Sequence, residues 1–358
     1  MNETTSDNEI SVLNSDASQI PKKKKAPEIS KNDSMSEAAR KILSLHFKKM
    51  LKHETGTRIG KDNEELHDMR VAAMRMRSAF KVFNDYLDMD TLNKPLKKIK
   101  RTRKKLGSVR DLDVFMEKIE HYLNDLPDER KSELNPLIDT LNVERDKSRG
   151  NMLIYLESNK YHKFVKNFSN LLEDDGVWKM SKFSDDGKPV PYKVKDVLPI
   201  LLHQQLATVR AYDEWVNRND TSYERLHQLR IDIKTLRYTL EFFNGVLGPE
   251  SKSIIKDLKR MQDHLGELHD TVVAIELLED FLKHGTWGES GLSILDSNTS
   301  LPGVESYLEF RNKELNNLVD TFPEAWNNLM SPVFSNRFSS AIAELYNNDT
   351  IPNNVVEN

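Results

Sequence analysis

Two segments of the chain recur about 160 residues apart, and this repetition constrains the fold more than any other feature. LHDMRVAAMRMRSAFKVF at 66–83 aligns without gaps on LHQLRIDIKTLRYTLEFF at 226–243. KKIKRTRKKLGSVRD at 97–111 aligns in the same way on KDLKRMQDHLGELHD at 256–270. Because two separate segments recur in the same order and at nearly the same offset, the sequence indicates a tandem duplication of one structural unit.

Each copy of the first segment has the apolar periodicity of a helix. At about 100° per residue its apolar side chains occupy one arc of roughly 100°. Asp62 and Thr221, each followed by a glutamate three residues later, are predicted to cap the two helices. The chain holds only 13 glycines and 13 prolines, too few for a loop-rich β-sandwich. We therefore expect an all-α fold of two tandem, pseudo-symmetric helical bundles with a basic groove or pore between them. The predicted core positions are Leu66, Met69, Ala73, Met76, Phe80 and Phe83, with Leu226, Leu229, Ile233, Leu236, Leu240 and Phe243 in the second copy.

Composition along the chain places the boundaries of these units. Polar ends predict disordered tails at 1–35 and 346–358, and the two bundles then span 36–185 and 186–345. Segments rich in Gly, Pro and polar residues break the helical period at 173–192 and 284–303. A PKKKKAP run at 21–27 is interpreted as part of a solvated tail, with a nuclear targeting signal or an anion tether as alternatives.

Several classes of protein are excluded by composition. The chain has no cysteine, which rules out disulfides, thiolate zinc sites and a cysteine nucleophile. The amino terminus lacks the pattern of a secretory signal, and no apolar run approaches the roughly 18 residues of a membrane span, so a cytoplasmic protein is expected. The formal net charge is −4, so any site for anions must come from local segregation of charge.

Such segregation occurs beside the apolar arc of the first repeated segment. Basic side chains lie within about 80° of one another there, and the second copy repeats the pattern. For one helix a solvated basic surface is the simpler interpretation. The duplication preserves His, Arg and Arg at identical steps while other exposed positions diverge, which favours the lining of a groove. The residues are His67, Arg70 and Arg77 in the first copy, and His227, Arg230, Lys234 and Arg237 in the second.

The second repeated segment adds to this charge. Residues 94–110 contain nine Lys or Arg and no acid. Like charges at this density repel by about 1 kcal/mol per close pair even in water, so a polyanion that neutralises them is expected. Gly107 and Gly266 indicate close approach, of another helix in preference to a bound anion chain. Asp111 and Asp270 are interpreted as groups that orient neighbouring arginines or lie at helix ends. The cations on one helical face are Lys97, Lys100, Arg101 and Lys104, matched by Lys256, Lys259 and Arg260, with Asp263 where Lys104 stands.

Several of these stretches resemble the CHAD family, the conserved-histidine α-helical domains. They are LHDMRVAAMRMRSAF, LGSVRDLD, LHQLRIDIKTLRYTLEFF and LGELHD, and the resemblance covers roughly residues 36–345. It implies two helical bundles that bind inorganic polyphosphate in a basic groove or pore, association with polyphosphate granules, and no enzymatic activity. His67 and His227 match the histidines for which the family is named, and Arg70, Arg77, Arg230, Lys234 and Arg237 match the basic positions that follow.

The chain departs from the family pattern at one position in each copy. Met74-Arg75 and Lys234-Thr235 stand where family members usually have two adjacent basic residues, so one cation per copy is missing. This puts the affinity and the phosphate register in doubt. The alternating acidic ExExK signature of a triphosphate-tunnel domain is also absent, so the chain resembles a CHAD protein without that catalytic partner.

Three other functions remain as alternatives. A polyphosphate-processing enzyme would need a metal site, but His264 and His269 are about 140° apart on a helix and no HExxH motif occurs. A nucleic-acid binder normally adds aromatic stacking platforms, whereas the basic segments hold only Phe80 and Phe83, both on the apolar arc. A scaffold whose basic groove binds an acidic partner protein is compatible with all of these residues.

The resulting prediction is non-enzymatic binding of polyphosphate, without catalytic residues, metal or cofactor, and without sequence-specific nucleic acid or membrane contact. The two family histidines are expected either to contact phosphate as imidazolium or to act as neutral hydrogen-bonding or packing groups. The predicted site comprises His67, Arg70, Arg75, Arg77, Lys97, Lys100, Arg101, Lys104, His227, Arg230, Lys234, Arg237, Lys256, Lys259 and Arg260.

Overall fold

The computed structural model describes residues 28–179, 182–184, 186–216, 222–287 and 300–347. Within these residues the fold is helical, with isolated β-bridges and no strand, which confirms the predicted all-α class. None of the helices described is long and apolar enough to cross a membrane. The helices are α1 (Met35–Lys52), α2 (Glu54–Ile59), α3 (Asn63–Val82), α4 (Met89–Asn124), α5 (Asp128–Lys131), α6 (Asn135–Glu157), α7 (Asn159–Glu173), α8 (Val194–Arg210), α9 (Asp213–Val216), α10 (Tyr223–Phe242), α11 (Ser251–His284), α12 (Pro302–Leu329) and α13 (Pro332–Asn347), with 3-10 turns η1 (Asn84–Tyr86) and η2 (Ser132–Leu134).

The repeated first segment forms α3 and α10, and both of its predicted apolar stripes are buried. No residue of either stripe is more than 4% exposed. Asp62 caps α3, accepting a hydrogen bond from the backbone N–H of Glu64 at 2.9 Å. Helix α10 is capped by Ser222, and the predicted cap Thr221 lies outside the described residues. The two predicted breaks coincide with the connections between α7 and α8 and between α11 and α12.

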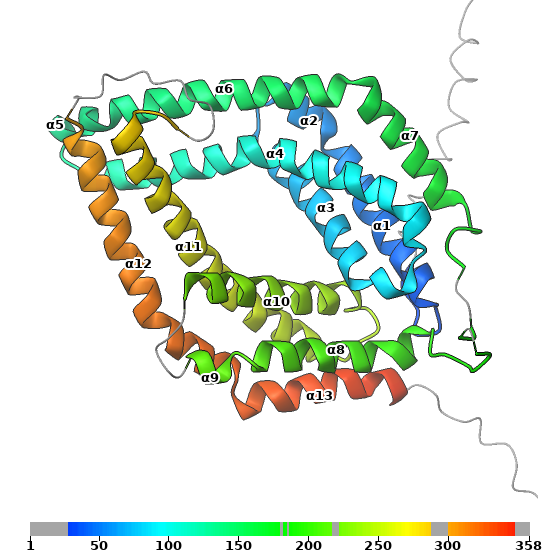
Figure 1. Cartoon of the computed structure of the whole chain (residues 1–358). Helices are drawn as coiled ribbons and strands as arrows, with labels where there is room; N and C mark the ends of the chain where they lie inside the picture. The colour runs from blue at the N-terminus through cyan, green and yellow to red at the C-terminus, as the bar shows by residue number, and fades with distance from the viewer. Residues whose placement is uncertain (1–27, 180–181, 185, 217–221, 288–299, 348–358) are drawn as a thin grey trace, which may run out of the picture.

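The long helices form a four-sided frame (Figure 1). Helix α3 packs on α1 and α4, and α4 packs on α6; in the second half α10 packs on α8 and α11, and α11 packs on α12 and α13. The two halves meet at two places. One is the junction of α3 with α10 and of α1 with α8, and the other is the contact of α12 with η2. The first repeated segments therefore meet directly at one corner of the frame. The helices of the second ones, α4 and α11, form neighbouring sides whose carboxyl-terminal parts share the smaller core described below (Figure 1).

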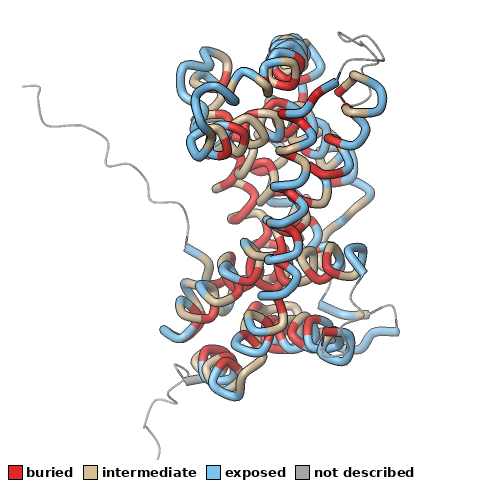
Figure 2. The backbone as a smooth tube through the Cα atoms, turned by 90° about the vertical axis from the view of Figure 1, so that its left-hand side faces the viewer, coloured by how far each residue is buried: buried red, intermediate tan, exposed pale blue. Residues whose placement is uncertain are grey.

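Each junction has its own buried core. The larger core joins apolar residues of α1, α3, α4, α7, α8, α10, α11 and α13. The smaller core includes Ile119 and Tyr122 of α4, with Phe281 of α11 and Tyr307 of α12. Both cores draw on both sides of the predicted boundary at 185/186, so each half completes the core of the other. Figure 2 shows buried and exposed segments alternating along the helices, as expected for helices that pack on only part of their surface.

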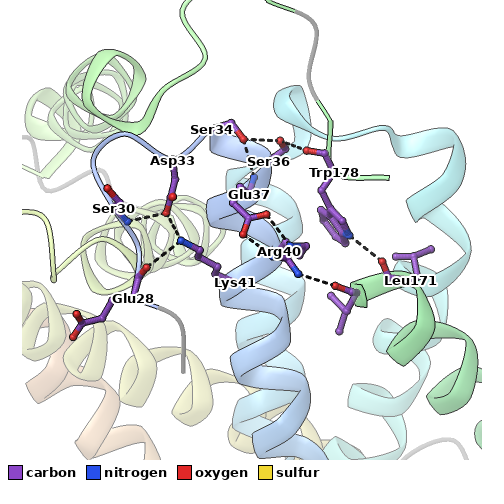
Figure 3. Close-up of polar contacts among 11 residues, drawn as sticks. Glu28, Ser30, Asp33, Ser34, Ser36, Glu37, Arg40, Lys41, Leu171 and Trp178 are labelled. Atoms are coloured by element: carbon purple, nitrogen blue, oxygen red, sulfur yellow. Dashed lines mark hydrogen bonds and ion pairs between the residues drawn. The ribbon is translucent and has the colours of Figure 1, made fainter. Parts of the chain in front are cut away.

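The start of α1 ties the amino-terminal segment to the connection before α8. Residues 28–35, which the sequence places in a tail, instead form hydrogen bonds with this connection: the N–H of Val194 donates to the carbonyl of Asp33 at 2.9 Å. Inside α1 the hydroxyl of Ser36 donates to the carbonyl of Trp178 at 2.6 Å (Figure 3). Backbone pairing of this kind depends on residues about 160 positions away, which explains why local composition did not predict it.

Candidate anion-binding site

A pocket of about 430 Å³ lies between α3, α4, α10, α11 and α12. Both halves of the chain contribute cations to its wall, and Arg70 of α3 and Arg230 of α10 occupy equivalent positions in the two repeated segments. Helix α12, which lies outside those segments, also contributes. The basic residues that line the pocket are His67, Arg70, Arg110, Lys118, Arg230, His269 and Arg311.

Arg70 is positioned by a carboxylate and a glycine of α4. Its Nη2 donates to Oδ1 of Asp111 at 3.0 Å, which confirms the prediction that Asp111 orients a neighbouring arginine. A Cβ atom on Gly107 would lie 3.6 Å from Nε of Arg70. In the second half a Cβ on Gly266 would lie 3.7 Å from Nε of Arg230. The group near each glycine is thus an arginine side chain of another helix, Arg70 of α3 and Arg230 of α10.

Several of these arginines have hydrogen-bonding capacity that the protein leaves unused. The Nε atoms of Arg70, Arg230 and Arg311 are buried without a hydrogen-bond partner in the protein. Arg311 itself is only 2% exposed, and it is held by the hydroxyl of Thr271 at 2.9 Å and by Glu314. A buried donor without a partner costs free energy. Guanidinium groups bind anions through charge-assisted hydrogen bonds, so the arginines that line this pocket can hold an anion.

A second group of cations converges on Lys234 of α10. Its Nζ lies 3.0 Å from the sulfur of Met74 in α3. Burial, followed by the nearby charges of Arg230, Arg70, Arg103 and Arg237, lowers the pKa of Lys234 to about 7. The ammonium form is disfavoured because desolvation and like charges both oppose it. The predicted site residue Lys234 therefore lies where the positive potential of the two halves accumulates.

Two predicted site residues form ion pairs with a carboxylate of the protein. Arg237 is 7% exposed, pairs with Glu241 and donates from Nε to Gln262 at 2.9 Å. Arg75 of α3 reaches the same Glu241 at 2.6 Å. These two arginines therefore join α3 to α10 through a shared acid. The helical wheel places Arg237 on the basic face and Arg75 about 140° from Arg70, but it contains no information about a carboxylate that both arginines can reach.

The two predicted histidines, His67 and His227, have different surroundings. His67 lines the pocket. His227 instead lies against His269, with their Nδ1 atoms 3.3 Å apart and the ring centroids 4.3 Å apart. Burial, followed by the charges of His227 and Arg230, lowers the pKa of His269. One histidine of this pair must present an unprotonated Nδ1 to accept the hydrogen bond, so the pair cannot be doubly charged while the bond exists.

The remaining predicted cations lie along α4 and α11 at different angles from the pocket. Taking Gly107 and Gly266 as the centre of the basic face, Lys100, Lys104 and Lys259 lie within about 60° of it, and Lys97 and Lys256 about 80° away. Arg101 and Arg260 lie about 120° away. Arg101 stands 5.3 Å from the ring centroid of Tyr155 in α6, and Arg260 pairs with Asp257 at 3.3 Å. The structure thus does not bring these two arginines to the pocket.

Arg77 lies on the α3 face that carries Arg70, two turns further along. It is exposed, and its charge contributes to the lowered pKa of Arg103 in α4, whose main cause is burial. The charge of Arg70 also lowers the pKa of Arg103, and the charge of Arg103 lowers the pKa of Lys234. The basic region consequently continues from the pocket along α3 and α4 toward the α3–α10 junction.

Sequence reasoning missed several residues of the site. Arg103 and Arg110 belong to the charged stretch 94–110, but they lie outside the helical face that was predicted to bind the anion. His269 is the counterpart of Arg110 in the alignment of the repeats, so that alignment was a usable signal. Arg311 comes from α12, where no repeated motif pointed to it. These additions make the site more arginine-rich than predicted.

The pocket also contains aromatic side chains, which come from outside the two basic segments. Phe80 and Phe83 are buried as predicted, at 2% and 0% exposure. The pocket is nevertheless lined by Phe115, Trp287 and Tyr307, which come from outside the basic segments. Phe115 packs edge-on against Trp287, with ring centroids 4.7 Å apart. Contacts between distant segments brought these rings to the pocket, and a segment-by-segment count of aromatics could not predict them.

Among the residues that the structure describes, no group of three or more His, Asp or Glu side chains is arranged to hold a metal ion.

Comparison with known proteins identifies relatives in sequence and in fold. The sequence profile of the CHAD domain matches residues 41–279. The crystal structure of the CHAD domain from the plant Ricinus communis superposes with a TM-score of 0.55 at 22% identity, covering 90% of this chain and 95% of that one. PptA from Streptomyces chartreusis superposes with a TM-score of 0.57 at 13% identity, covering 82% of this chain and all of the other. No curated protein matches the sequence.

Proposed function

Because the chain belongs to the CHAD family, we propose that it binds inorganic polyphosphate without chemically transforming it. The single observation that carries this proposal is the convergence of Arg70 and Arg230, one from each half, on one pocket. Their buried Nε atoms have no partner in the protein. Phosphate oxygens are acceptors that match the planar donor pattern of a guanidinium.

A chain of phosphates fits this site better than a single phosphate. The cations extend from the pocket, through Arg103 and Arg77, to Lys234 at the α3–α10 junction. Polyphosphate repeats its charge along its length and could neutralise successive cations. Retention on polyphosphate granules is the cellular consequence that we propose.

The test is binding of the purified protein to polyphosphates of graded length at physiological salt, with single-stranded RNA of equal charge as competitor. We expect the affinity to rise with the length of the polyphosphate chain and to persist in the presence of the RNA competitor. If about eight phosphates are neutralised, the logarithm of the binding constant should fall with the logarithm of salt concentration with a slope near −5 to −6. Incubation should release no orthophosphate. Equal affinity for RNA, or no dependence on length, would reject the proposal.

A matched pair of double variants locates the site. Arg70→Ala with Arg230→Ala should weaken binding by about 100-fold or more, taking about 1.5 kcal/mol for each charged hydrogen-bonding group. Arg101→Ala with Arg260→Ala removes the same charge at two other equivalent positions of the repeats, which the structure turns away from the pocket. This control should change affinity by a few-fold at most. Equal losses in both variants would indicate a diffuse basic surface.

A further inference from the structure

The pocket changes character along α4 and α11 in a way that a chain of phosphates alone does not explain. Near Gly107 and Gly266 the wall is cationic, through Arg70 and Arg230. One turn later each helix presents an aspartate, Asp111 and Asp270. After these, most residues that α4 and α11 contribute to the wall are apolar, although Lys118 and Arg311 line the pocket as well. The first apolar lining residues follow the glycines after five residues on α4, at Leu112, and after seven on α11, at Val273, which is about 8 and 10 Å of helix.

The apolar part is built from both halves and from α12. Val114 and Phe115 of α4 face Val273 and Leu277 of α11, and Tyr307 of α12 closes this end. Val273 is 37% exposed although it lines the same pocket as Arg230 and His269. An exposed branched apolar side chain in such a place gains nothing from a polyanion, but it would contact an apolar group of a ligand.

The aspartates lie between these two zones and remain accessible. The side chain of Asp111 is 69% exposed even though one oxygen accepts a hydrogen bond from Arg70, and Asp270 is exposed as well. Carboxylates repel phosphate. They accept hydrogen bonds from sugar hydroxyls, a pairing that nucleotide-binding folds use for ribose.

We infer that the pocket binds a nucleoside polyphosphate, with its phosphates at Arg70 and Arg230, its ribose hydroxyls at Asp111 and Asp270, and its base against Val114, Phe115 and Val273. The inference rests on the proposed anion site, because the phosphates use the same arginines. The volume of about 430 Å³ falls in the range of pockets that hold small ligands. Long polyphosphate and the nucleotide would therefore compete at the arginines, while only the nucleotide uses the apolar wall.

The first experiment compares ATP, 2′,3′-dideoxy-ATP, tripolyphosphate and adenosine by titration calorimetry, with EDTA present. Tripolyphosphate carries the same number of phosphates with more negative charge, so electrostatics alone would make it the tighter ligand. We expect ATP to bind at least tenfold more tightly than tripolyphosphate, and the dideoxy compound to lose several-fold relative to ATP. Equal or weaker binding of ATP would overturn the inference. In that case, binding of long polyphosphate in the same buffer would show that the proposed function holds even though the nucleotide inference fails.

A pair of variants then tests the apolar wall. Val273→Trp fills it without changing charge, so ATP affinity should fall to that of tripolyphosphate while tripolyphosphate binding is kept. Val319→Trp on α12 is the control, because Val319 is similarly exposed at 38% and does not line the pocket. Retention of full ATP affinity in Val273→Trp would contradict the placement of the base. Should that variant fail to fold, the ligand series on the unmodified protein decides the question by itself.

Discussion

At the scale of single residues, the site is governed by the position of charged groups relative to one another and to water. Lys234 shows this most clearly, because burial and four neighbouring arginines lower its pKa to about 7. A lysine in this state gains charge when an anion arrives, since the anion raises the pKa again. Binding of an anion near Lys234 should therefore take up a proton.

The pH dependence of polyphosphate binding follows from this linkage. Above a pH of about 7 the free protein lacks the proton that the complex holds, so affinity should fall as pH rises from 7 to 9, by up to about tenfold per unit. Below that range Lys234 is already charged in the free protein, and its contribution becomes constant. Lys234→Met should abolish this slope, and Lys252→Met, an exposed lysine at the start of α11, should keep it. Binding titrations across this pH range check both, and an unchanged slope in Lys234→Met would contradict the assignment.

Gly107 provides a prediction about packing at the same scale. A Cβ atom there would meet Arg70 and Asp111 at 3.6 and 3.7 Å, which are ordinary contact distances. Gly107→Ala should thus be tolerated and should stabilise α4 by up to about 1 kcal/mol in urea unfolding, because alanine favours the helix. Gly107→Leu should displace the guanidinium of Arg70 and weaken polyphosphate binding with helicity intact. Gly150→Leu is the control, since nothing lies within 4 Å of a Cβ at Gly150. Parental binding by Gly107→Leu would show that Arg70 does not depend on this contact.

At the scale of helices, the junction of α1, α3 and α10 combines apolar packing with buried polar groups. His46 of α1 is 4% exposed, and its ring lies 6.0 Å from that of Phe242 in α10. Burial, followed by the charges of Arg75 and Lys49, lowers the pKa of His46 to about 3. The folded protein therefore holds this histidine neutral in a place where the unfolded chain would protonate it below about pH 6.5.

The free energy of unfolding should fall as pH drops from about 6.5 toward 3, because His46 binds a proton in the unfolded state and stays unprotonated in the folded state. The loss attributable to this residue is of the order of 4 kcal/mol at the low end. His46→Leu should remove that part of the pH dependence in urea unfolding. His162→Leu, on α7, is the control, because His162 is exposed. If both variants lose stability with pH as the parent does, other groups control acid unfolding.

At the scale of the whole molecule, the site exists only where the two halves meet. Arg70 and Arg230 belong to different halves, and both cores join residues from either side of residue 185. A ligand that contacts both arginines binds the folded state and has no equivalent site in the unfolded chain. Such a ligand stabilises the fold by about 2.7 kcal/mol at a concentration one hundred times its Kd.

Polyphosphate should accordingly raise the midpoint of thermal unfolding by several degrees, with a dependence on ligand concentration. Arg70→Ala and Arg230→Ala should each reduce the rise, and the double variant should abolish it. The outward pair, Arg101→Ala with Arg260→Ala, should retain it. Thermal unfolding followed by circular dichroism checks this, and a rise that persists in the first double variant would place the ligand elsewhere.

The sequence by itself determined the helices, their buried stripes and the central arginines of the site. Helical periodicity is a local property, so the faces of α3 and α10 could be predicted from spacing alone. The comparison of the repeats added Arg70 and Arg230, and it made Asp111 recognisable as a partner of arginine.

Only the tertiary structure decided which of these faces meet. In the folded protein Arg75 and Arg237 pair with Glu241. His227 lies against His269. Arg101 and Arg260 point away from the pocket. The tertiary structure also brought Arg311 and three aromatic rings into the wall from segments without a motif. Periodicity fixes the direction of a side chain relative to its own helix. Its partners depend on how helices far apart in the sequence pack, which local spacing does not encode.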